Sequence, residues 1–225
     1  MRNTLVVSEA LESRTFLSAS PASGVLGTAV QADQLQVRQD LLKFKSDAIG
    51  CTLTLFSDVN AVRADDLKGA KTLRPLVAKF RHDVGAMRTQ LWMDRMTQAQ
   101  NALADESVIV GIHKKMLLDK GNSTAEAADR SALLAERIKL QTDLVTGLTS
   151  RLNTRQNDTN TIFNDGQAIV TAAQSDPNAS SQLQSALVKW AGDKGTCMGT
   201  MATDIQTLIT DRNQLVTDLT AMQSQ

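Results

Sequence analysis

The sequence predicts an all-α protein, a long antiparallel up-down-up-down four-helix bundle with coiled-coil-like packing. Only three prolines occur in 225 residues, so long stretches can be helical without a break. Hydrophobic residues make up 42% of the chain, but aromatic residues make up 3% and tyrosine is absent. A core built from small and aliphatic side chains favours helices over sheets. Apolar residues also recur at alternating steps of three and four, which is the helical period.

Three clusters of stop and start signals divide the chain. A basic turn with Gly69 is followed by Thr72, which can cap the next helix. Gly121 ends a second helix, and Ser123-Thr124-Ala125-Glu126 has the pattern of a capping box. Asp176 is expected to cap a fourth helix, with Pro177 in its first turn. The predicted helices are Ala32 to Lys68, Leu73 to Asp119, Thr124 to Gln174 and Asn178 to Gln223.

Each of the last three helices contains an apolar seam with helical spacing. The seam of the last helix is interrupted by one polar residue, Arg212. Because short connections between long helices make neighbours antiparallel, these seams are expected to face a common core. The seam residues are Leu73, Val77, Phe80, Val84, Met87 and Leu91; Val145, Leu148 and Leu152; and Ile205, Leu208, Leu215, Leu219 and Met222. Met93, Met96 and Trp92 are also expected in the core.

Charge and hydropathy limit the classes of partner. The chain has 24 basic and 24 acidic residues and a formal net charge of zero. A neutral chain offers no basic surface for nucleic acid or anionic lipid. No stretch approaches the roughly 18 consecutive apolar residues of a membrane span. We therefore expect neither a nucleic-acid partner nor a membrane span.

The first twenty residues contain the one motif with a functional meaning. The apolar run Leu5-Val6-Val7 is too short for an ordinary secretory signal, which needs roughly 7 to 15 apolar residues. The segment Glu9-Ala10-Leu11-Glu12-Ser13-Arg14-Thr15-Phe16-Leu17-Ser18-Ala19 resembles the LEPR-xLL motif at the N-termini of envelope and extracellular proteins of planctomycetes and related bacteria. The matching positions are Leu11, Glu12, Arg14 and Leu17, while Ser13 replaces the proline and Phe16 replaces the first leucine of the pair.

The resemblance implies a sorting or export role for this segment and nothing about the activity of the rest. An amphipathic N-terminal tail is the alternative interpretation. Residues 18–28 are rich in Ser, Ala and Gly, which is typical of a flexible linker. We therefore divide the chain into a sorting segment with its linker, residues 1–30, and a four-helix bundle, residues 31–225.

The first and fourth helices resemble each other at an offset of 146 residues. Eight identical pairs and several conservative ones align without a gap, which suggests an internal duplication. Two heptad helices rich in Asp and Thr also agree by composition alone. The identical pairs are Gln36/Gln182, Leu41/Leu187, Lys43/Lys189, Asp47/Asp193, Cys51/Cys197, Thr54/Thr200, Asp58/Asp204 and Asp65/Asp211.

The two cysteines are expected at nearly the same height on neighbouring helices. At about 1.5 Å per residue in an antiparallel bundle, Cys51 lies at roughly 27 Å and Cys197 at roughly 31 Å. A disulfide requires Cα atoms within about 7 Å and an oxidising compartment. Two buried free thiols are the alternative.

Several glycines are expected at mid-height, beside a polar run on the third helix. We interpret the glycines as points of close helix packing and the polar run as solvent-facing; a hinge or a polar pocket is the alternative. The residues are Gly50, Gly85, Gly192, Gly195 and Gly199, with 153–161 as the polar run.

No catalytic, metal-binding or cofactor-binding pattern is recognisable. The two histidines, His82 and His113, lie outside the Glu-x-x-His and His-x-x-x-His spacings of helical metal sites. The prediction is thus a non-enzymatic, exported helical protein of the cell envelope, periplasm or extracellular space. It acts as a structural or interaction component through self-association or an unknown protein partner. The alternative is a ligand-sensing or lipid-binding bundle with a central cavity lined by Phe44, Phe56, Trp190 and Met201.

Overall fold

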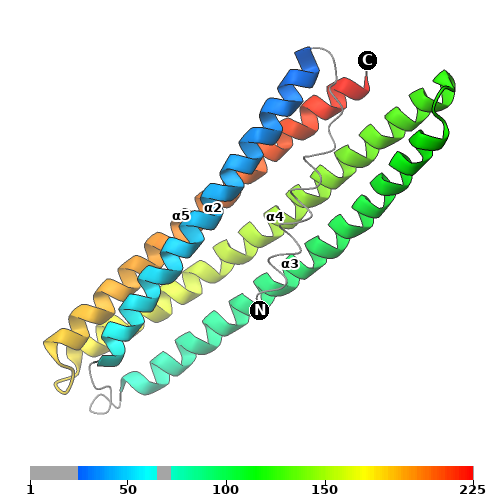
Figure 1. Ribbon diagram of the computed structural model, residues 1–225. Helices are drawn as coiled ribbons and strands as arrows, with labels where there is room; N and C mark the ends of the chain where they lie inside the picture. Colours follow the sequence, from blue (N-terminus) through cyan, green and yellow to red (C-terminus); the bar gives the residue numbers. More distant parts are fainter. Residues whose placement is uncertain (1–24, 65–71, 225) are drawn as a thin grey trace. The chain divides into compact units, whose positions relative to one another are not determined.

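The computed structural model describes residues 25–64 and 72–224, and every regular element in these ranges is an α-helix (Figure 1). The prediction of an all-α four-helix fold is confirmed. The helices are α2 (Val25–Ala64), α3 (Leu73–Leu118), α4 (Ser123–Ser175) and α5 (Ser181–Gln223).

Helix α2 begins earlier than predicted, at Val25 instead of Ala32. Residues 25–28, the end of the predicted linker, are therefore helical. Val30 is buried in a cluster with Leu215 and Leu219 of α5. Burial of Val30 offsets the weak helix preference of Gly27 and Thr28 beside it. The predicted end at Lys68 lies outside the described residues.

The start of α4 is shifted by one residue from the predicted capping box. Asn122 is the N-cap, since its Oδ1 accepts a hydrogen bond from the backbone N–H of Ala125 (3.2 Å). The Glu126 side chain folds toward the start of the helix, as in a capping box, but its Oε1 accepts a hydrogen bond from the backbone N–H of Gly121 (2.8 Å). Gly121 has a φ of 94°, the left-handed conformation that ends helices and favours glycine. Its predicted role as a terminator is confirmed.

The predicted cap of α5 is wrong. Helix α5 begins at Ser181, and the Asp176 carboxylate accepts hydrogen bonds from the Thr72 hydroxyl (2.5 Å) and from the N–H of Asn178 (2.9 Å). The residues that follow it form a turn. The Oγ of Ser180 instead accepts from the N–H of Leu183 (3.0 Å), so Ser180 is the N-cap.

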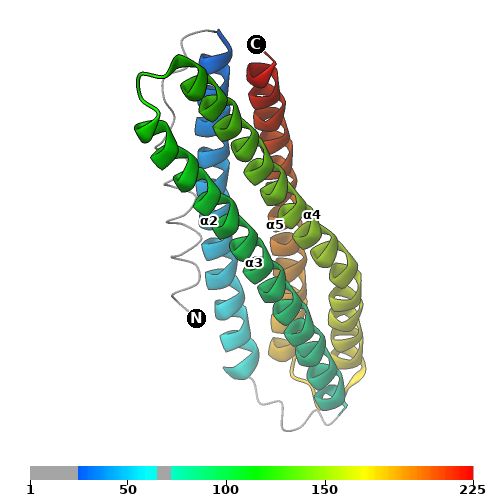
Figure 2. The same ribbon diagram turned by 90° about the vertical axis from the view of Figure 1, so that its right-hand side faces the viewer.

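The described helices pack as two compact units, and each unit contains part of all four helices. The first comprises residues 25–40, 94–149 and 207–224. The second comprises residues 41–64, 72–93 and 150–206. Within the units, α2 runs beside α5 and α3 runs beside α4, as the disulfide, the ion pairs between helices and both ribbon views show (Figures 1 and 2).

The predicted seams form the cores. In the second unit, Leu73 and Phe80 of α3 pack with Ile162 of α4 and Leu183 of α5. In the first unit, Leu215 and Leu219 form one cluster with Val30, and a second cluster joins α3 to α4 through Ile109, Leu140 and Leu144. The expectation that Trp92 and Met93 fill the core is wrong, since their side chains are exposed.

Arg212, the polar residue of the α5 seam, is buried in the first unit. Its guanidinium donates a hydrogen bond to Oε1 of Gln141 on α4 (2.6 Å). A buried cation must keep such an acceptor, because leaving it without one costs several kcal/mol. The pair therefore defines the register of α5 against α4 at this level.

Candidate functional site

A disulfide joins α2 to α5 in the second unit. Cys51 and Cys197 have their Cα atoms 5.5 Å apart, and both described cysteines are in this bond. The prediction that the two residues lie side by side on neighbouring helices is confirmed. The bridge spans 146 residues of sequence and links the first and last of the described helices.

On one side of the disulfide, a lysine binds two aspartates, one on the neighbouring helix and one four residues later on its own helix. We call this arrangement a lysine clamp. Lys43 of α2 donates to Asp204 Oδ1 of α5 (2.5 Å) and to Asp47 Oδ2 on its own helix (2.7 Å). The Asp204 side chain is almost fully buried, whereas the Lys43 side chain is largely exposed. The lysine stem thus extends along the helix and places its ammonium over a buried carboxylate.

The other side of the disulfide has the same clamp with the helices exchanged. Lys189 of α5 donates to Asp58 Oδ1 of α2 (2.5 Å) and to Asp193 Oδ2 on its own helix (2.7 Å). Asp58 is buried in the same way as Asp204. The contacts therefore have an approximate two-fold arrangement about the disulfide.

These clamps consist of residues that match at the 146-residue offset: Lys43 corresponds to Lys189, Asp47 to Asp193 and Asp58 to Asp204. A compositional coincidence does not require matched residues to make equivalent contacts. The two-fold arrangement therefore supports the duplication hypothesis.

The clamps shift the ionisation of their exposed members. Hydrogen bonds from Lys43 and from Lys189 lower the pKa of Asp47 and of Asp193, respectively, below the ordinary value of 3.8. The stability that these two carboxylates contribute is therefore complete above about pH 4, and it is lost as the pH falls through their folded-state pKa values.

Three further lysines form the same clamp between α3 and α4. Lys79 contacts Asp165 (2.5 Å) and Asp83 (2.9 Å) in the second unit. In the first unit, Lys115 contacts the buried Asp129, and Lys139 contacts the buried Asp105. All five lysines also have an aspartate four residues later, at 47, 83, 119, 143 and 193. Sequence reasoning missed this Lys-x-x-x-Asp signal, which recurs across all four helices.

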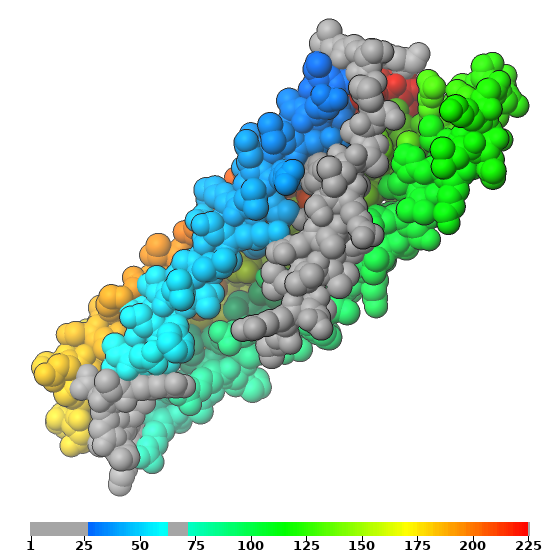
Figure 3. Space-filling view, viewed as in Figure 1, coloured from blue at the N-terminus to red at the C-terminus, as the bar shows by residue number. Residues whose placement is uncertain are grey.

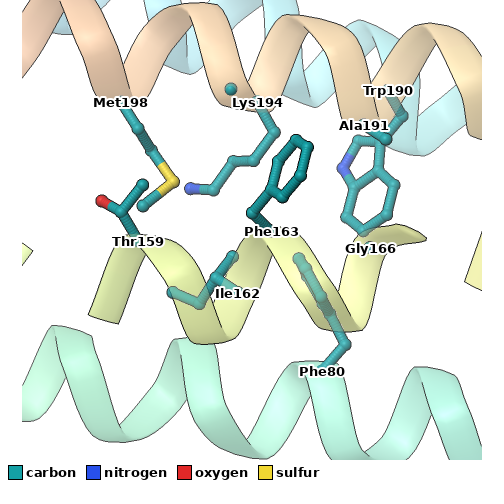
Figure 4. A pocket seen from close by; sticks show the side chains of 10 residues that line it. Phe80, Thr159, Ile162, Phe163, Gly166, Trp190, Ala191, Lys194 and Met198 are labelled. Carbon is teal, nitrogen blue, oxygen red and sulfur yellow. The ribbon is translucent and has the colours of Figure 1, made fainter. Parts of the chain in front are cut away.

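A shallow pocket lies between α4 and α5 in the second unit, with Phe80 of α3 at one side (Figure 4). It is not the predicted cavity. Of the four predicted lining residues only Trp190 lines it, while Phe56 is exposed and Met201 is buried in the core. The space inside accommodates roughly one water molecule, which is too small for an organic ligand.

Lys194 of α5 extends into this pocket. Figure 4 shows its side chain between those of Met198 and Phe163. No hydrogen bond or ion pair joins Lys194 to another residue in the described ranges. Burial, followed by the charges of Arg88 and Arg155, lowers the pKa of the Lys194 ammonium from 10.5 to about 8.

Replacing Lys194 with methionine is expected to stabilise the protein by about 2 kcal/mol at pH 7, because a costly buried charge is removed. The wild-type penalty is complete below pH 8 and fades as the pH rises from about 8 to 10.5, where the folded-state ammonium loses its proton first. Urea unfolding at pH 7 and pH 10 measures the difference between the two proteins. The exposed Lys114→Met is the control, and an equal gain at both pH values contradicts the prediction.

The first unit holds a carboxylate cluster between α2 and α5. A hydrogen bond with Asp40, then burial, then the charges of Asp40 and Asp33, raise the pKa of Asp211 to about 6. Burial and the neighbouring Asp218 also raise the pKa of Asp33. No group of three or more His, Cys, Asp or Glu in the described ranges has the geometry of a metal site.

The predicted glycine contacts are not formed. A Cβ atom added at any of the five mid-height glycines has no neighbouring atom within 4 Å, so the prediction of close helix packing at these glycines is wrong. The polar run 153–161 lies within the continuous helix α4, and none of its residues is buried. The tight glycine is Gly147, where a Cβ atom comes within 2.9 Å of the Gln98 side chain. The five glycines without such contacts are Gly50, Gly85, Gly192, Gly195 and Gly199.

The motif residues Leu11, Glu12, Arg14, Phe16 and Leu17 lie outside the described residues. Among the described helices, none has an apolar stretch long enough to cross a bilayer. No protein-family model, curated protein or solved structure matches the chain.

Proposed function

We propose that this chain is an exported, non-enzymatic helical protein that serves as a structural or protein-interaction component of the cell envelope or extracellular space. The observation that carries the proposal is the disulfide between α2 and α5. Disulfides persist in oxidising compartments and are rare in the reducing cytosol. The resemblance of residues 9–19 to an envelope and extracellular sorting motif supports the same destination.

The polar clusters of the described residues support a structural role. In four of the five clamps a lysine joins a buried aspartate of the neighbouring helix, so these charges hold helices in register. Carboxylates and lysines paired in this way have their charges neutralised by each other. The one pocket residue with a markedly lowered pKa, Lys194, faces a space of roughly one water molecule.

Export is tested by locating the C-terminally tagged protein in fractionated native cells, with and without residues 2–20. We expect the full chain in the envelope or extracellular fraction, with its two cysteines resistant to alkylation until reduced. Without the segment, we expect cytoplasmic protein with free thiols. Deletion of residues 20–24, which leaves the motif intact, is the matched control and should not alter localisation. Cytoplasmic full-length protein with free thiols would overturn the proposal.

A further inference from the structure

Helix α2 has a second apolar seam on the side away from α5. Its residues follow steps of four and three along the helix, and every one of them is exposed. This spacing is that of a coiled-coil contact surface. We call these eight residues the α2 outer seam: Leu35, Gln39, Leu42, Ser46, Ile49, Leu53, Phe56 and Asn60.

The exposure of the outer seam is high and continuous. Its five large apolar residues are between 56% and 65% exposed. The residues of α2 that are buried, such as Val37 and Asp58, lie on the other side, where α5 packs. Figure 3 shows atoms of α2, coloured blue to cyan, at the surface on the face in view. Single exposed apolar residues are ordinary on protein surfaces, but an aligned row of five marks an interaction site.

The outer seam contains no charged residue over its eight positions. Five are apolar, and Gln39, Ser46 and Asn60 are uncharged and polar. Such a surface can meet an identical surface without like-charge repulsion, which is the requirement for a two-fold interface between copies. A seam made for a basic or acidic partner would contain the opposite charge.

We propose that the partner of the α2 outer seam is the α2 outer seam of a second copy of this chain, paired in parallel and in register. The proposal rests on the proposed interaction function and names its partner. In this register each seam residue meets its own counterpart. Gln39, Ser46 and Asn60 therefore meet uncharged polar side chains that can hydrogen-bond with them, as buried amides do in parallel coiled coils. An antiparallel pair would place Gln39 against Phe56.

Flanking charges permit this register. Arg38 of each copy faces Lys43 of the other, which gives two potential repulsions across the seam. Lys43 is already bound to Asp47 and Asp204, so its charge is largely compensated within its own chain. A repulsion between exposed, compensated charges costs little.

The area is sufficient for a weak specific dimer. Each large apolar residue at this exposure leaves roughly 100 Å² of surface in water, so a pair of chains buries about 1,000 Å² through these side chains. This value lies at the lower limit for specific interfaces, and the three polar positions and the lysine stems add to it. We therefore expect a dimer that dissociates in the micromolar range.

The mass of the full chain in solution tests the proposal. Sedimentation equilibrium at 1 to 100 µM is expected to show a concentration-dependent dimer, and Ile49→Glu is expected to weaken dimerisation at least 100-fold. Circular dichroism checks that the helices remain, because Ile49 is exposed in the monomer. Leu118→Glu, at an even more exposed site on α3, is the matched control and should dimerise normally. A full chain that is monomeric at 100 µM, or a dimer unaffected by Ile49→Glu, overturns the proposal.

Cross-linking tests the register. With the native disulfide in place, Asn60→Cys is expected to form a covalent dimer under mild oxidation, since like positions meet only in the parallel pair. Thr54→Cys, exposed on α2 but off the outer seam, is the control. Absence of the Asn60→Cys cross-link in a chain that dimerises overturns the parallel register. If the chain dimerises only after residues 2–20 are removed, that segment covers the seam and the second copy is not its native occupant. None of these outcomes depends on export.

Discussion

Replacing Cys51 and Cys197 together with alanine is expected to lower the free energy of unfolding by about 4 to 5 kcal/mol. The bridge closes a loop between residues 146 apart, so it strongly restricts the unfolded chain. In the chain-entropy description such a restriction raises the free energy of the unfolded state. Alanine is chosen because Cys197 is buried, and a serine hydroxyl would add its own desolvation cost.

Urea unfolding followed by circular dichroism measures this loss. Cys51→Ala alone should lose as much as the double variant, because one cysteine cannot form the bridge. The wild-type protein in reducing buffer should match both variants, which separates the bond from the packing of the sulfur atoms. A loss below 1 kcal/mol for all three would contradict a stabilising bridge.

Lys43→Met and Lys189→Met are each expected to lower the free energy of unfolding at pH 7, because each leaves a buried carboxylate without its cation. Each substitution keeps the aliphatic stem but removes the cation from a buried carboxylate, Asp204 in one case and Asp58 in the other. Both ammonium groups are largely exposed to water, so solvent screening makes the loss smaller than that from breaking a fully buried ion pair.

The comparison between these two variants also tests the two-fold arrangement. Equivalent clamps on either side of the disulfide should lose equal stability within the error of the measurement. Lys114→Met, on an exposed site of α3, is the control and should change stability by less than about 0.5 kcal/mol. Denaturant midpoints of all three variants measure these differences in stability. A loss confined to one of the two clamps would contradict the two-fold arrangement.

Local signals predicted the helices well. Gly121 ends α3 because its left-handed backbone suits glycine, and that preference belongs to the residue itself. The seam from Ile205 to Leu219 is buried as its spacing predicts. The start of α5 differs from the prediction: Asp176 lies before a turn and accepts a hydrogen bond from Thr72, a residue 104 positions away. No local pattern contains that contact, and Ser180 caps the helix instead.

The site was predicted less completely than the helices. The cysteines were placed side by side because an antiparallel pair of helices has a simple rise per residue. The lysine clamps were missed, although each has a Lys-x-x-x-Asp signal, because such a spacing is common on solvated helix faces. The partner across the helices, such as Asp58 for Lys189, depends on the register of two segments far apart in sequence.

The sequence by itself determined that the chain forms helices, where Gly121 interrupts them and which residues alternate in apolar seams. These properties depend on backbone preference and on the period of one helix. Only the tertiary structure decided which seam of α2 is covered. The face with Val37 packs against α5, while the face with Ile49 is left in water. Apolar residues on both faces of α2 have helical spacing, so the spacing alone does not predict which face a neighbouring helix covers. The packing of the four helices determines which face is buried.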